Sequence, residues 1–327
     1  MKKYNVAVVG ATGVVGTTFL RVLDEYNFPI NELRLFASEK SVGKEVVFKG
    51  EQYYIKRLTL DSFNDIDFAL FSAGASVSLE WAPIAEAAGA IVIDNSKAFR
   101  MNEDCSLIVP EINIEDYKNK RKIIANPNCS TIQSVIPLNA LKKYGLKRVI
   151  YTTYQAVSGS GAKGIADYNN TINGGEGSFY PYNISKTCIP QIDVFLDNGY
   201  TKEEIKMIEE TKKILHMPKL LVTATCVRVP ILMSHAVSVV VELEKDFELE
   251  NIIEDFNKQE GLVVLDAPKE NIYPTTIHST GNDMVYVGRI RKDLSNSKSL
   301  MFYCVADNIR KGAASNAVMI AKKIIEE

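Results

Sequence analysis

A glycine-rich segment close to the N-terminus constrains the fold of this chain more than any other feature. Residues 4–9, YNVAVV, are apolar and rich in β-branched side chains, which predicts a short buried strand. GATGVVG follows at residues 10–16, and apolar side chains then recur at helical spacing over residues 17–26. In such a unit the glycines let the backbone approach a pyrophosphate, and the helix N-terminus supplies N–H donors. The segment predicts a dinucleotide-binding βα unit; a glycine-rich turn of another α/β fold is the alternative.

Strand-like and helix-like segments continue to alternate as far as about residue 96. Residues 32–38, 65–74 and 90–96 are short apolar runs typical of buried strands, and residues 81–89 form an alanine-rich helical segment that closes at a glycine. Strands that alternate with helices predict a parallel, doubly wound sheet. We therefore expect an N-terminal Rossmann-like domain.

The pattern changes after about residue 128. Residues 147–161 read as a long strand that runs into a Gly/Ser loop. Apolar and polar residues alternate in four later segments, which predicts an antiparallel or mixed sheet with one buried face: 221–231, 235–244, 284–293 and 299–308. Residues 201–215 read as a charged amphipathic helix that begins at a capping box formed by Thr201 and Glu204. Residues 167–191 look irregular, and the last stretch is helical. We predict a Rossmann domain of residues 1–128 and 309–327 and an inserted α+β domain of residues 129–308.

The composition fits an ordinary globular protein and excludes several classes of function. Hydrophobic residues make up 46% of the 327 residues, charged residues 24%, and the formal net charge is −2. No basic excess indicates nucleic acid or a membrane surface as a partner. We interpret the basic and then apolar N-terminus as the first strand and not as a signal peptide, and no run reaches the length of a membrane span. We expect a cytoplasmic protein.

The cysteines and histidines predict neither a disulfide framework nor a metal site. The five cysteines are odd in number and widely spaced, without a CxxC pair, which favours a reducing compartment. The three histidines do not have metal-ligand spacing either. We expect no metal.

The end of the second predicted strand bears on the type of dinucleotide. An NAD site usually has an acidic residue there that accepts from the ribose 2′-hydroxyl. Here the segment reads FASEKSVGK, so that Ser38, Lys40, Ser41 and Lys44 would offer hydroxyls and cations to a 2′-phosphate. Glu39, an acidic residue in the same segment, favours NAD instead. The segment favours NADP over NAD.

Cys129 stands in the segment NPNCSTIQ, just before a stretch that reads as a helix from about residue 130. A thiol at a helix N-terminus has its thiolate stabilised by the helix dipole, and the thiolate is the nucleophile. The N–H groups there, such as that of Ser130, could receive an oxyanion. A buried thiol that only fills space is the commoner alternative.

A nucleophilic thiol usually works with a base. Of the three histidines, His235 begins an apolar strand, and spacing alone gives it about an even chance against a purely structural role. Arg228, in the apolar segment CVRVP, predicts a carboxylate clamp or an ion pair, because a charge in such a strand is costly alone. Arg100 follows a Rossmann strand and could meet an anion; a solvated surface residue is the alternative.

Together these pieces resemble the aspartate-β-semialdehyde dehydrogenase family, in its shorter, Gram-positive-type branch, and the match runs nearly end to end. NPNCST and RVPxxxxH in combination are the most specific part. The segments that carry the resemblance are GATGVVG (10–16), SAG (72–74), DNSKAFRM (94–101), VPEIN (109–113), NPNCSTIQ (126–133), TTYQAVSGSG (152–161), IPQID (189–193), the helix at 203–215, CVRVPILMSH (226–235), VGRIR (287–291) and VADNIRKGAA (305–314).

The resemblance implies a fold similar to glyceraldehyde-3-phosphate dehydrogenase and a two-step reaction in amino-acid biosynthesis. L-Aspartyl 4-phosphate acylates Cys129, inorganic phosphate leaves, and NADPH reduces the thioester to L-aspartate 4-semialdehyde. The resemblance also implies assembly through the second domain as a homodimer or homotetramer.

The resemblance assigns roles to individual residues as well. His235 would be the acid/base and Gln155 would orient the substrate. Arg228 would bind the α-carboxylate, Glu203 the amino group, and Arg100, Lys206 and Asn128 the phosphate. The residues expected at the NADP site are Gly10, Thr12, Gly13, Val14, Val15, Ser38, Lys40, Ser41, Ala73, Ser158, Gly159 and Asn308.

Two departures and two alternatives accompany this reading. Lys97 stands where a small residue is more usual and could add charge near the phosphate site, and the segment at 276–280 is untypical, with an effect that the residues do not reveal. N-acetyl-glutamyl-phosphate reductase shares the architecture, but its cysteine motif resembles NPGCY. An inactive paralogue that only binds nucleotide is the other alternative, against which Cys129, Gln155, Arg228 and His235 argue.

Overall fold

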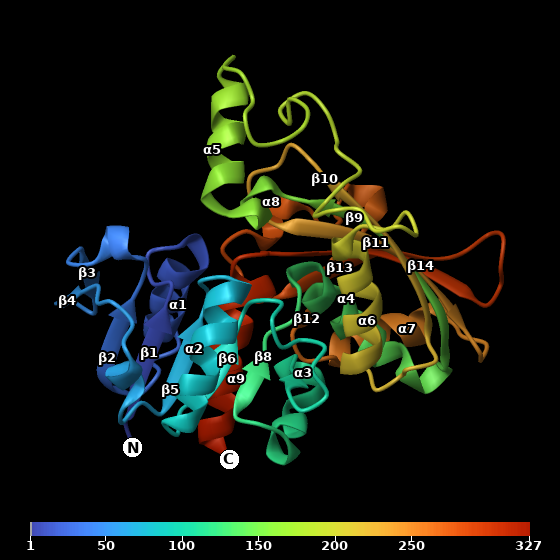
Figure 1. Ribbon diagram of the computed structural model, residues 1–327. Coiled ribbons are helices and arrows are strands. Elements are labelled where there is room, and N and C mark those ends of the chain that lie inside the picture. The colour runs from blue at the N-terminus through green and yellow to red at the C-terminus, as the bar shows by residue number, and fades with distance from the viewer. Residues whose placement is uncertain (1) are drawn as a thin grey trace. The chain divides into compact units, whose positions relative to one another are not determined.

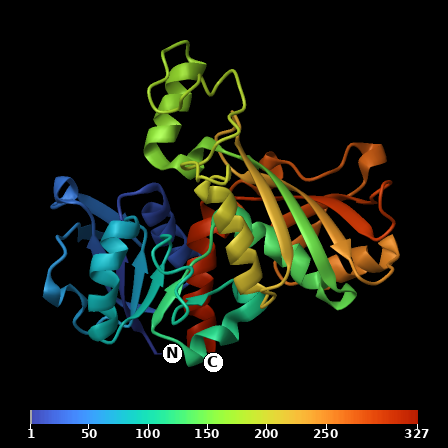
Figure 2. The same cartoon turned by 45° about the vertical axis from the view of Figure 1, so that its right-hand side comes forward.

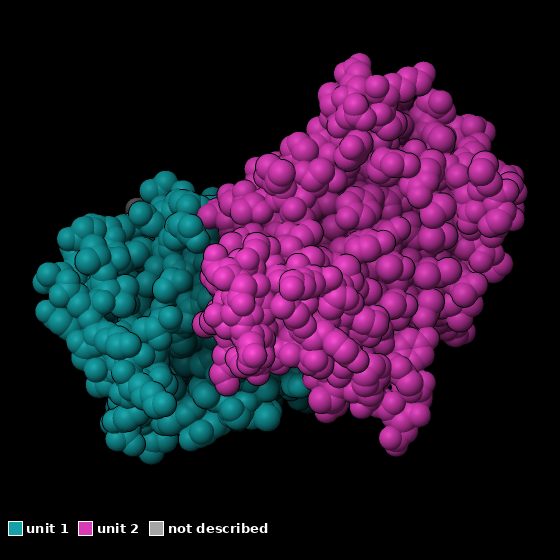
Figure 3. Space-filling view, turned by 90° about the horizontal axis from the view of Figure 1, so that it is seen from above, with its two compact units in different colours: residues 1–127, 313–327 teal, residues 128–312 magenta. Residues whose placement is uncertain are grey.

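The computed structural model describes residues 2–327 and divides into two compact units. Unit 1 comprises residues 1–127 and 313–327, and unit 2 comprises residues 128–312 (Figure 3). The boundaries predicted from the sequence were 128/129 and 308/309. The observed second boundary, 312/313, lies inside a π-helical turn, Arg310–Ala314, that leads into the C-terminal helix.

Unit 1 is built on a six-stranded sheet in which all the paired strands are parallel (Figure 1). The order across the sheet is β2-β1-β5-β6-β8-β7. The strands are β1 (Tyr4–Val9), β2 (Ile30–Phe36), β5 (Phe68–Phe71), β6 (Ile91–Asp94), β7 (Ser106–Leu107) and β8 (Ile123–Ala125).

The helices of unit 1 wind the sheet in both directions. Helix α1 (Val14–Glu25) connects β1 to β2 on one side of β1, whereas α2 (Ala75–Ala87) connects β5 to β6 on the other side. Because such crossovers are right-handed, the two helices cover opposite faces, and the order reverses between β1 and β5. In open α/β sheets ligands bind at the carboxyl ends of the strands at this switch point. The predicted Rossmann-like fold is confirmed.

The C-terminal helix α9 (Ser315–Glu326) completes the core of unit 1. It packs against α1 and β6, and its apolar stripe joins one buried cluster with side chains of β1 and α1. The apolar residues of α9 in this cluster are Ala317, Val318, Ile320 and Ala321. The chain therefore returns to its first domain at the end.

Smaller elements of unit 1 were not foreseen. A hairpin of β3 (Glu45–Phe48) and β4 (Glu51–Tyr54) turns at Lys49 and Gly50, both in the left-handed region with φ of 52° and 80°. The remaining short helices are η1 (Glu39–Ser41), η2 (Leu60–Phe63), α3 (Pro110–Asn113) and η3 (Ile114–Asn119).

Unit 2 contains a six-stranded mixed sheet in the order β10-β9-β11-β14-β13-β12, whose strands carry green, orange and red colours in Figure 2. The pairs β10/β9 and β12/β13 are parallel and the other three are antiparallel. The strands are β9 (Leu146–Gln155), β10 (Leu221–Arg228), β11 (His235–Leu243), β12 (Leu262–Val264), β13 (Val285–Lys292) and β14 (Ser299–Ala306). The predicted mixed sheet with one buried face is confirmed.

Three helices pack on this sheet. Helix α4 (Cys129–Leu141) contacts β9, β11, β13 and β14; α6 (Lys202–Ile214) contacts α4 and β10; α7 (Leu249–Lys258) contacts α4, β12 and β13. Thr201 caps α6 in the predicted capping box, with Glu204 returning a bond to the Thr201 N–H. The other short elements are η4 (Lys142–Tyr144), η5 (Val157–Ser160), η6 (Pro268–Glu270) and α8 (Thr276–Ser279).

One part of the segment expected to be irregular is helical. Helix α5 (Gly161–Ile172) packs against η5, and its buried Asp167 accepts the backbone N–H groups of Ser178 and Phe179. The asparagine- and glycine-rich composition hid this helix, because its stability depends on the loop that folds back onto it.

Candidate active site

The glycine-rich turn of unit 1 fits a pyrophosphate. Gly10 has a φ of 89°, and a Cβ there would lie 2.9 Å from the backbone of Ser72, so only glycine fits between the ends of β1 and β5. A Cβ on Gly16 would lie 2.0 Å from the Gly10 carbonyl oxygen, which fixes α1 tightly against the turn. Gly13 precedes α1 without a side-chain cap, and no acidic residue occupies the first turn. The N–H groups there are suited to an anion.

The neighbouring predicted cofactor residues lie along the same end of the sheet. Thr12 and Gly13 are exposed, while Val14 and Val15 begin α1 and are partly buried. Ala73 follows β5 and immediately precedes Gly74, the N-cap of α2. These residues surround the switch point of the parallel sheet.

The segment after β2 forms the short helix η1, with Ser38 at its N-cap. Ser38 and Lys40 are exposed, and Ser41 is buried. Glu39, which argued against NADP, pairs with Arg57 at 3.6 Å, and both side chains are 72% exposed. The carboxylate is thus partly neutralised by a second cation of the same region.

Arg100 is not the solvated surface residue that was its alternative. It is buried, and its guanidinium donates through Nε to the Asn126 carbonyl oxygen at 2.9 Å and through Nη2 to the Asn95 carbonyl oxygen at 3.0 Å. These two carbonyls belong to the residues after β8 and β6, so the guanidinium lies at the carboxyl ends of both strands. Lys97, by contrast, is exposed.

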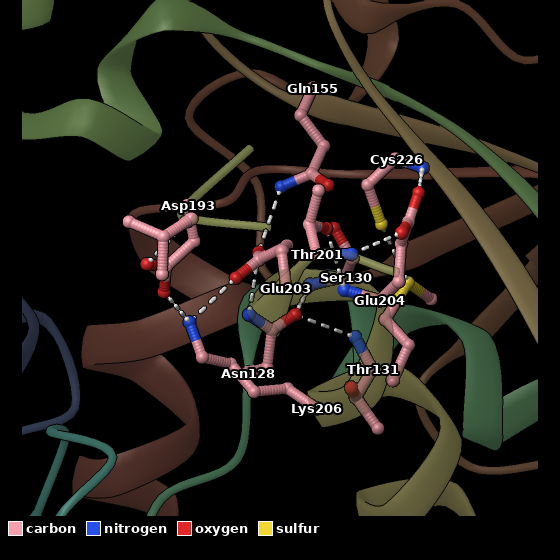
Figure 4. Close-up of polar contacts among 12 residues, drawn as sticks. Asn128, Ser130, Thr131, Gln155, Asp193, Thr201, Glu203, Glu204, Lys206 and Cys226 are labelled. Carbon is pink, nitrogen blue, oxygen red and sulfur yellow. Dashed lines mark hydrogen bonds and ion pairs between the residues drawn. The ribbon is translucent and has the colours of Figure 1, made fainter. Parts of the chain in front are cut away.

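Cys129 is the first residue of α4, as the sequence predicted, and it is partly exposed. The preceding residue, Asn128, caps the helix: its Oδ1 accepts the N–H groups of Ser130 at 2.9 Å and Thr131 at 3.3 Å (Figure 4). The proposal that the Ser130 N–H receives an oxyanion is therefore wrong, because the cap already uses that donor. The dipole of α4 still favours a thiolate at its start.

Two buried carboxylates of α6 hold Asn128 in place. Asn128 Nδ2 donates to Glu203 Oε1 at 2.8 Å, and the Asn128 backbone N–H donates to Glu210 Oε2 at 2.6 Å. Glu210 was not predicted as a site residue. Its position seven residues after Glu203 places it two helical turns farther along the same face, and this spacing could have revealed it.

Glu203 is the centre of a polar network that Figure 4 displays. Its Oε1 also accepts from Gln155 Nε2 at 3.2 Å, and its Oε2 accepts from Lys206 Nζ at 2.9 Å. Burial alone would raise the pKa of this carboxyl, but the charge of Lys206 and the donated hydrogen bonds lower the pKa to about 2. Lys206 also pairs with Asp193 at 2.9 Å. Four predicted site residues, Asn128, Gln155, Glu203 and Lys206, are thus directly connected.

Burial selects His235 among the three histidines, since His216 and His278 are exposed. Its Nδ1 accepts the Ala156 N–H at 3.0 Å, and its Nε2 is buried with no hydrogen-bond partner among the described residues. Burial, together with the charge of Arg228, lowers the pKa of His235 to about 3. The imidazole is therefore neutral at physiological pH.

Arg228 ends β10 and is buried, but no carboxylate in the described part of the chain forms an ion pair with it. Its Nη1 donates to the Ala156 carbonyl oxygen at 2.6 Å. A Cβ on Gly159 would lie 2.9 Å from Arg228 Nη1 and 3.1 Å from His235 Nε2, so this glycine lies against both side chains. A buried cation that lacks a protein carboxylate is suited to an anionic ligand.

The two remaining residues of unit 2 expected at the cofactor, Ser158 and Asn308, are buried and bond to each other at 3.1 Å. Asn308 Oδ1 also accepts the N–H of Ser234, which precedes His235 and has a φ of 72°. The Ser234 hydroxyl meets that of Thr280 at 2.8 Å. The untypical segment at 276–280 thus supports the strained residue before His235.

Two further residues beside the thiol were missed. Gln133 lies one turn after Cys129 on α4, and its Nε2 donates to the His235 carbonyl oxygen at 3.1 Å, which ties the thiol helix to the histidine strand. Gly312, in the π-helical turn, lies against the thiol residue, since a Cβ there would be 2.7 Å from Cys129 Cβ. NPNCSTIQ contained the first of these; neither had a local signal of its role.

Comparisons with known proteins agree with this geometry. Residues 5–120 match the family described as "Semialdehyde dehydrogenase, NAD binding domain", and residues 136–311 match "Semialdehyde dehydrogenase, dimerisation domain". The chain is 50% identical over 335 residues to the aspartate-semialdehyde dehydrogenase of Aquifex aeolicus, covering 99% of this chain and 98% of the relative. The chain belongs to the aspartate-semialdehyde dehydrogenase family.

Two further relatives support this membership of the family. The aspartate-semialdehyde dehydrogenase of Bacillus subtilis is 46% identical over 335 residues, covering 98% of this chain and 97% of the relative. A crystal structure of aspartate semialdehyde dehydrogenase II from Vibrio cholerae, complexed with ASA, superposes with a TM-score of 0.94 at 42% identity and covers 100% of this chain and 99% of its own. The family is an oxidoreductase family, and the resemblance inferred from the motifs is confirmed.

Two structural findings concern what the described residues lack. They contain no group of three or more histidine, cysteine or acidic side chains arranged to hold a metal. No helix in residues 2–327 is long and apolar enough to cross a membrane.

Proposed function

We propose that the protein catalyses the NADP-dependent reductive dephosphorylation of L-aspartyl 4-phosphate to L-aspartate 4-semialdehyde through an acyl-thioester on Cys129. One observation carries this most directly. A partly exposed thiol starts α4 next to a cap that is bonded to Glu203, which in turn contacts Gln155 and Lys206. Within the family, this arrangement unites a nucleophile with groups suited to an amino acid and its phosphate.

Each charged group of the substrate finds a group of opposite charge. Arg228, a buried cation whose guanidinium donates to the Ala156 carbonyl oxygen, would bind the α-carboxylate. Glu203 stays ionised because its pKa is about 2, and it would accept the amino group. Lys206 and Arg100 would bind the phosphate, with Asn128 alongside. Gln155, fixed by Thr153 and Glu203, would orient the acyl group.

The nicotinamide cofactor supplies a hydride when it is bound. We propose that the Gly10–Gly13 turn and the start of α1 hold its pyrophosphate, because the turn admits no Cβ at Gly10 and leaves the helix N–H groups without a side-chain cap. Ser38, Lys40 and Ser41 would receive a 2′-phosphate, which favours NADP. The other residues that we propose to contact the cofactor are Ala73, Ser158, Gly159 and Asn308.

We propose that the protein assembles through unit 2 as a homodimer or homotetramer. The family description of this region as a dimerisation domain supports it, as does the face of the sheet on which the rings of Tyr154 and Tyr303 meet at a tilt with centroids 6.1 Å apart while Tyr154 is 38% exposed. Sedimentation of the purified protein and of Tyr154→Glu tests this, since a charge in the interface would shift the protein toward monomer. We also propose a cytoplasmic location, because all five cysteines are thiols.

The decisive experiment is phosphate-dependent reduction of NADP with aspartate semialdehyde by the purified protein. We expect turnover in the wild type and a loss of at least about a thousandfold in Cys129→Ser, because a hydroxyl cannot replace the thiolate. Activity that requires N-acetyl-glutamate semialdehyde instead would move the protein to the other reductase. Equal rates in wild type and Cys129→Ser would remove the thioester from the mechanism.

A further inference from the structure

The two carbonyl groups that accept from Arg100 belong to Asn95 and Asn126, the residues that directly follow the paired strands β6 and β8. The backbone N–H of Asn95 donates to the Phe71 carbonyl oxygen at 2.9 Å, and that of Asn126 donates to the Asp94 carbonyl oxygen at 2.8 Å. Nε–H and one N–H of Nη2 lie on the same edge of a guanidinium and point in parallel. One edge of Arg100 is therefore held by the ends of two strands.

The side chains of the two asparagines are bonded to each other. Asn126 Nδ2 donates to Asn95 Oδ1 at 2.7 Å and to the Ala313 carbonyl oxygen at 3.1 Å. This bond between the two carboxamides holds the residues at a fixed separation, and with them the two carbonyl oxygens that accept from Arg100. Because a guanidinium is planar and rigid, fixing one of its edges also fixes the direction of the opposite edge.

Asn316, in the first turn of α9, extends this network to the C-terminal segment of unit 1. Its Nδ2 donates to Asn126 Oδ1 at 2.7 Å and to the Ile108 carbonyl oxygen at 3.0 Å. Asn126 and Asn316 are both fully buried. The C-terminal helix thus holds the carboxamide that fixes the separation of the two carbonyl groups at Arg100.

Backbone carbonyl groups determine how the two buried carboxamides are oriented. A carbonyl oxygen can only accept a hydrogen bond, so the atom of Asn126 that faces Ala313 must be Nδ2, and the atom of Asn316 that faces Ile108 must also be Nδ2. Asn126 Oδ1 then accepts from Asn316. An ionised aspartate at either position would direct an oxygen at a carbonyl oxygen, so the network requires a carboxamide at both.

Asn316 is a costly residue for a position that only fills the core. Its Oδ1 is buried and has no hydrogen-bond partner among the described residues. The side chains that follow it on α9 are apolar, and Ala317, Val318 and Ile320 lie in the hydrophobic cluster of unit 1. An apolar side chain at position 316 would avoid the unpaired oxygen. The carboxamide therefore indicates a requirement other than stability, and its contact with Asn126 identifies that requirement as a fixed geometry.

We propose that Asn95, Asn126 and Asn316 are positioning residues that direct the guanidinium of Arg100 at the phosphate group of the substrate. Asn126 and Asn316 are buried and act through Arg100. This inference rests on the proposed function, in which Arg100 binds the phosphate, and it adds the residues that give the guanidinium its direction. Loss of this direction should weaken the binding of phosphate and leave the binding of NADP and aspartate semialdehyde unchanged.

The first test compares Asn316→Ala with Val318→Ala, since both remove a fully buried side chain of α9 but only the first touches the network. The assay oxidises aspartate semialdehyde, so that inorganic phosphate is a substrate. We expect Asn316→Ala to raise the KM for phosphate about tenfold and to change kcat and the KM for NADP by less than about threefold. Val318→Ala should lower the melting temperature without changing the KM for phosphate. An equal KM for phosphate in the two variants would overturn the inference.

A double-mutant cycle tests whether Asn316 acts through Arg100. Arg100→Lys keeps the positive charge but lacks the fork that two carbonyl groups can hold, so it should raise the KM for phosphate at least about tenfold. Adding Asn316→Ala to Arg100→Lys should then change this KM by less than about twofold. If the two effects multiply, Asn316 acts by another route and the inference is wrong. It is also wrong if Arg100→Lys leaves the KM for phosphate unchanged.

A binding measurement separates this inference from the proposed function. The melting temperature of the full-length protein should rise with the concentration of inorganic phosphate, and the midpoint of this rise should shift about tenfold upward in Asn316→Ala but not in Val318→Ala. If the wild type shows this binding without turning over the semialdehyde, the proposed function fails and the positioning role stands. If the wild type turns over but both variants bind phosphate like the wild type, the positioning role fails. A wild type that does not bind phosphate overturns the inference as well.

Discussion

Two helices of this protein begin shortly after a strand of the parallel sheet, α1 after β1 and α4 after β8, and their N-termini differ. The N-cap of α1 is Gly13, which has no side chain to bond the first N–H groups. The N-cap of α4 is Asn128, whose carboxamide bonds two of them and is itself held by Glu203. The N-terminus of α1 therefore leaves its N–H groups for a ligand. The N-terminus of α4 bonds two of its N–H groups internally and offers only the helix dipole to Cys129.

The difference shows why a helix N-terminus alone does not define a function. An anion needs open N–H groups and a close backbone approach, which require glycine. A nucleophile needs a fixed position, which requires a cap that is bonded on all sides. Glu203 and Glu210 provide this by bonding both the side chain and the backbone N–H of Asn128.

The largest effect is expected at the start of α1. Gly16→Ala would place a Cβ 2.0 Å from the Gly10 carbonyl oxygen, and the turn would have to move. We expect cofactor binding to weaken about a hundredfold or more and the free energy of unfolding to fall by about 3 kcal/mol. Fluorescence titration with NADPH and denaturant unfolding measure the two. Gly13→Ala, with its Cβ 3.4 Å from the same oxygen, is the control for stability and should change it little.

The start of α4 is tested by Asn128→Ala. The variant removes the cap and leaves the buried Glu203 with one donor fewer, so we expect a loss of about 2–4 kcal/mol in stability and about a hundredfold in turnover. Thr59→Ala is the matched control, because it removes the N-cap of η2 in unit 1. It should cost about 1 kcal/mol and leave turnover unchanged. Similar turnover in both variants would mean that the α4 cap does not position the thiol.

The N-termini of α1 and α4 should also differ in how acid affects their stability. The folded pKa of Glu203, about 2, lies below its ordinary value of 4.5, so its ionised form stabilises the fold above pH 4.5. This contribution is lost as the pH falls from about 4.5 to 2, and the loss is about 3 kcal/mol. Chemical unfolding at several pH values should show that the free energy of unfolding falls less steeply with decreasing pH in Glu203→Gln than in the wild type. If the free energy of unfolding falls equally steeply with pH in both proteins, the Glu203 carboxyl is not ionised in the folded state.

A smaller effect is expected where Gly312 meets the thiol. In Gly312→Ala the new methyl group would lie 2.7 Å from Cys129 Cβ and displace it. We expect a loss of turnover of about tenfold with the KM for NADP unchanged. Gly177→Ala is the control, since its Cβ would lie 3.3 Å from the Thr171 methyl group and 3.5 and 3.7 Å from the Asp167 carboxylate oxygens, with no contact shorter than 3.0 Å. A higher KM for NADP with an unchanged kcat would show that the contact serves the cofactor and not the thiol.

The smallest effect is expected at the 2′-phosphate. Lys40 is exposed, so solvent screens its charge, and Lys40→Ala should reduce the preference of kcat/KM for NADP over NAD by about fivefold. Arg57→Ala, which releases the paired Glu39, should reduce the same preference, since an unpaired carboxylate repels the phosphate. Steady-state kinetics with both cofactors measures the change. An unchanged ratio in both variants would place the phosphate elsewhere.

Most of the local structure could be predicted from the sequence. The glycine spacing, the alternation of strands and helices, the Thr201–Glu204 capping box and the position of Cys129 at a helix start follow from backbone sterics and hydrophobic periodicity, which act over a few residues. The β3–β4 hairpin and α5 were missed, because their stabilising contacts are few or come from a distant loop.

The supporting contacts of the candidate site could not be predicted. Ser130 was expected to offer an N–H that Asn128 in fact occupies, and Gln133 and Gly312 gave no local signal of their contacts; Glu210 could be found only through its spacing from Glu203. The choice among three histidines needed burial, which depends on the whole sheet of unit 2.

The sequence by itself determined the fold class, the dinucleotide-binding turn, the thiol at its helix start and the family, because each depends on residues close together in the chain. The tertiary structure decided how these groups are held: which carboxylates fix Asn128, and which backbone N–H faces His235. The physical reason is that a hydrogen bond between residues 79 positions apart, such as Ala156 to His235, depends on sheet register and not on local pattern.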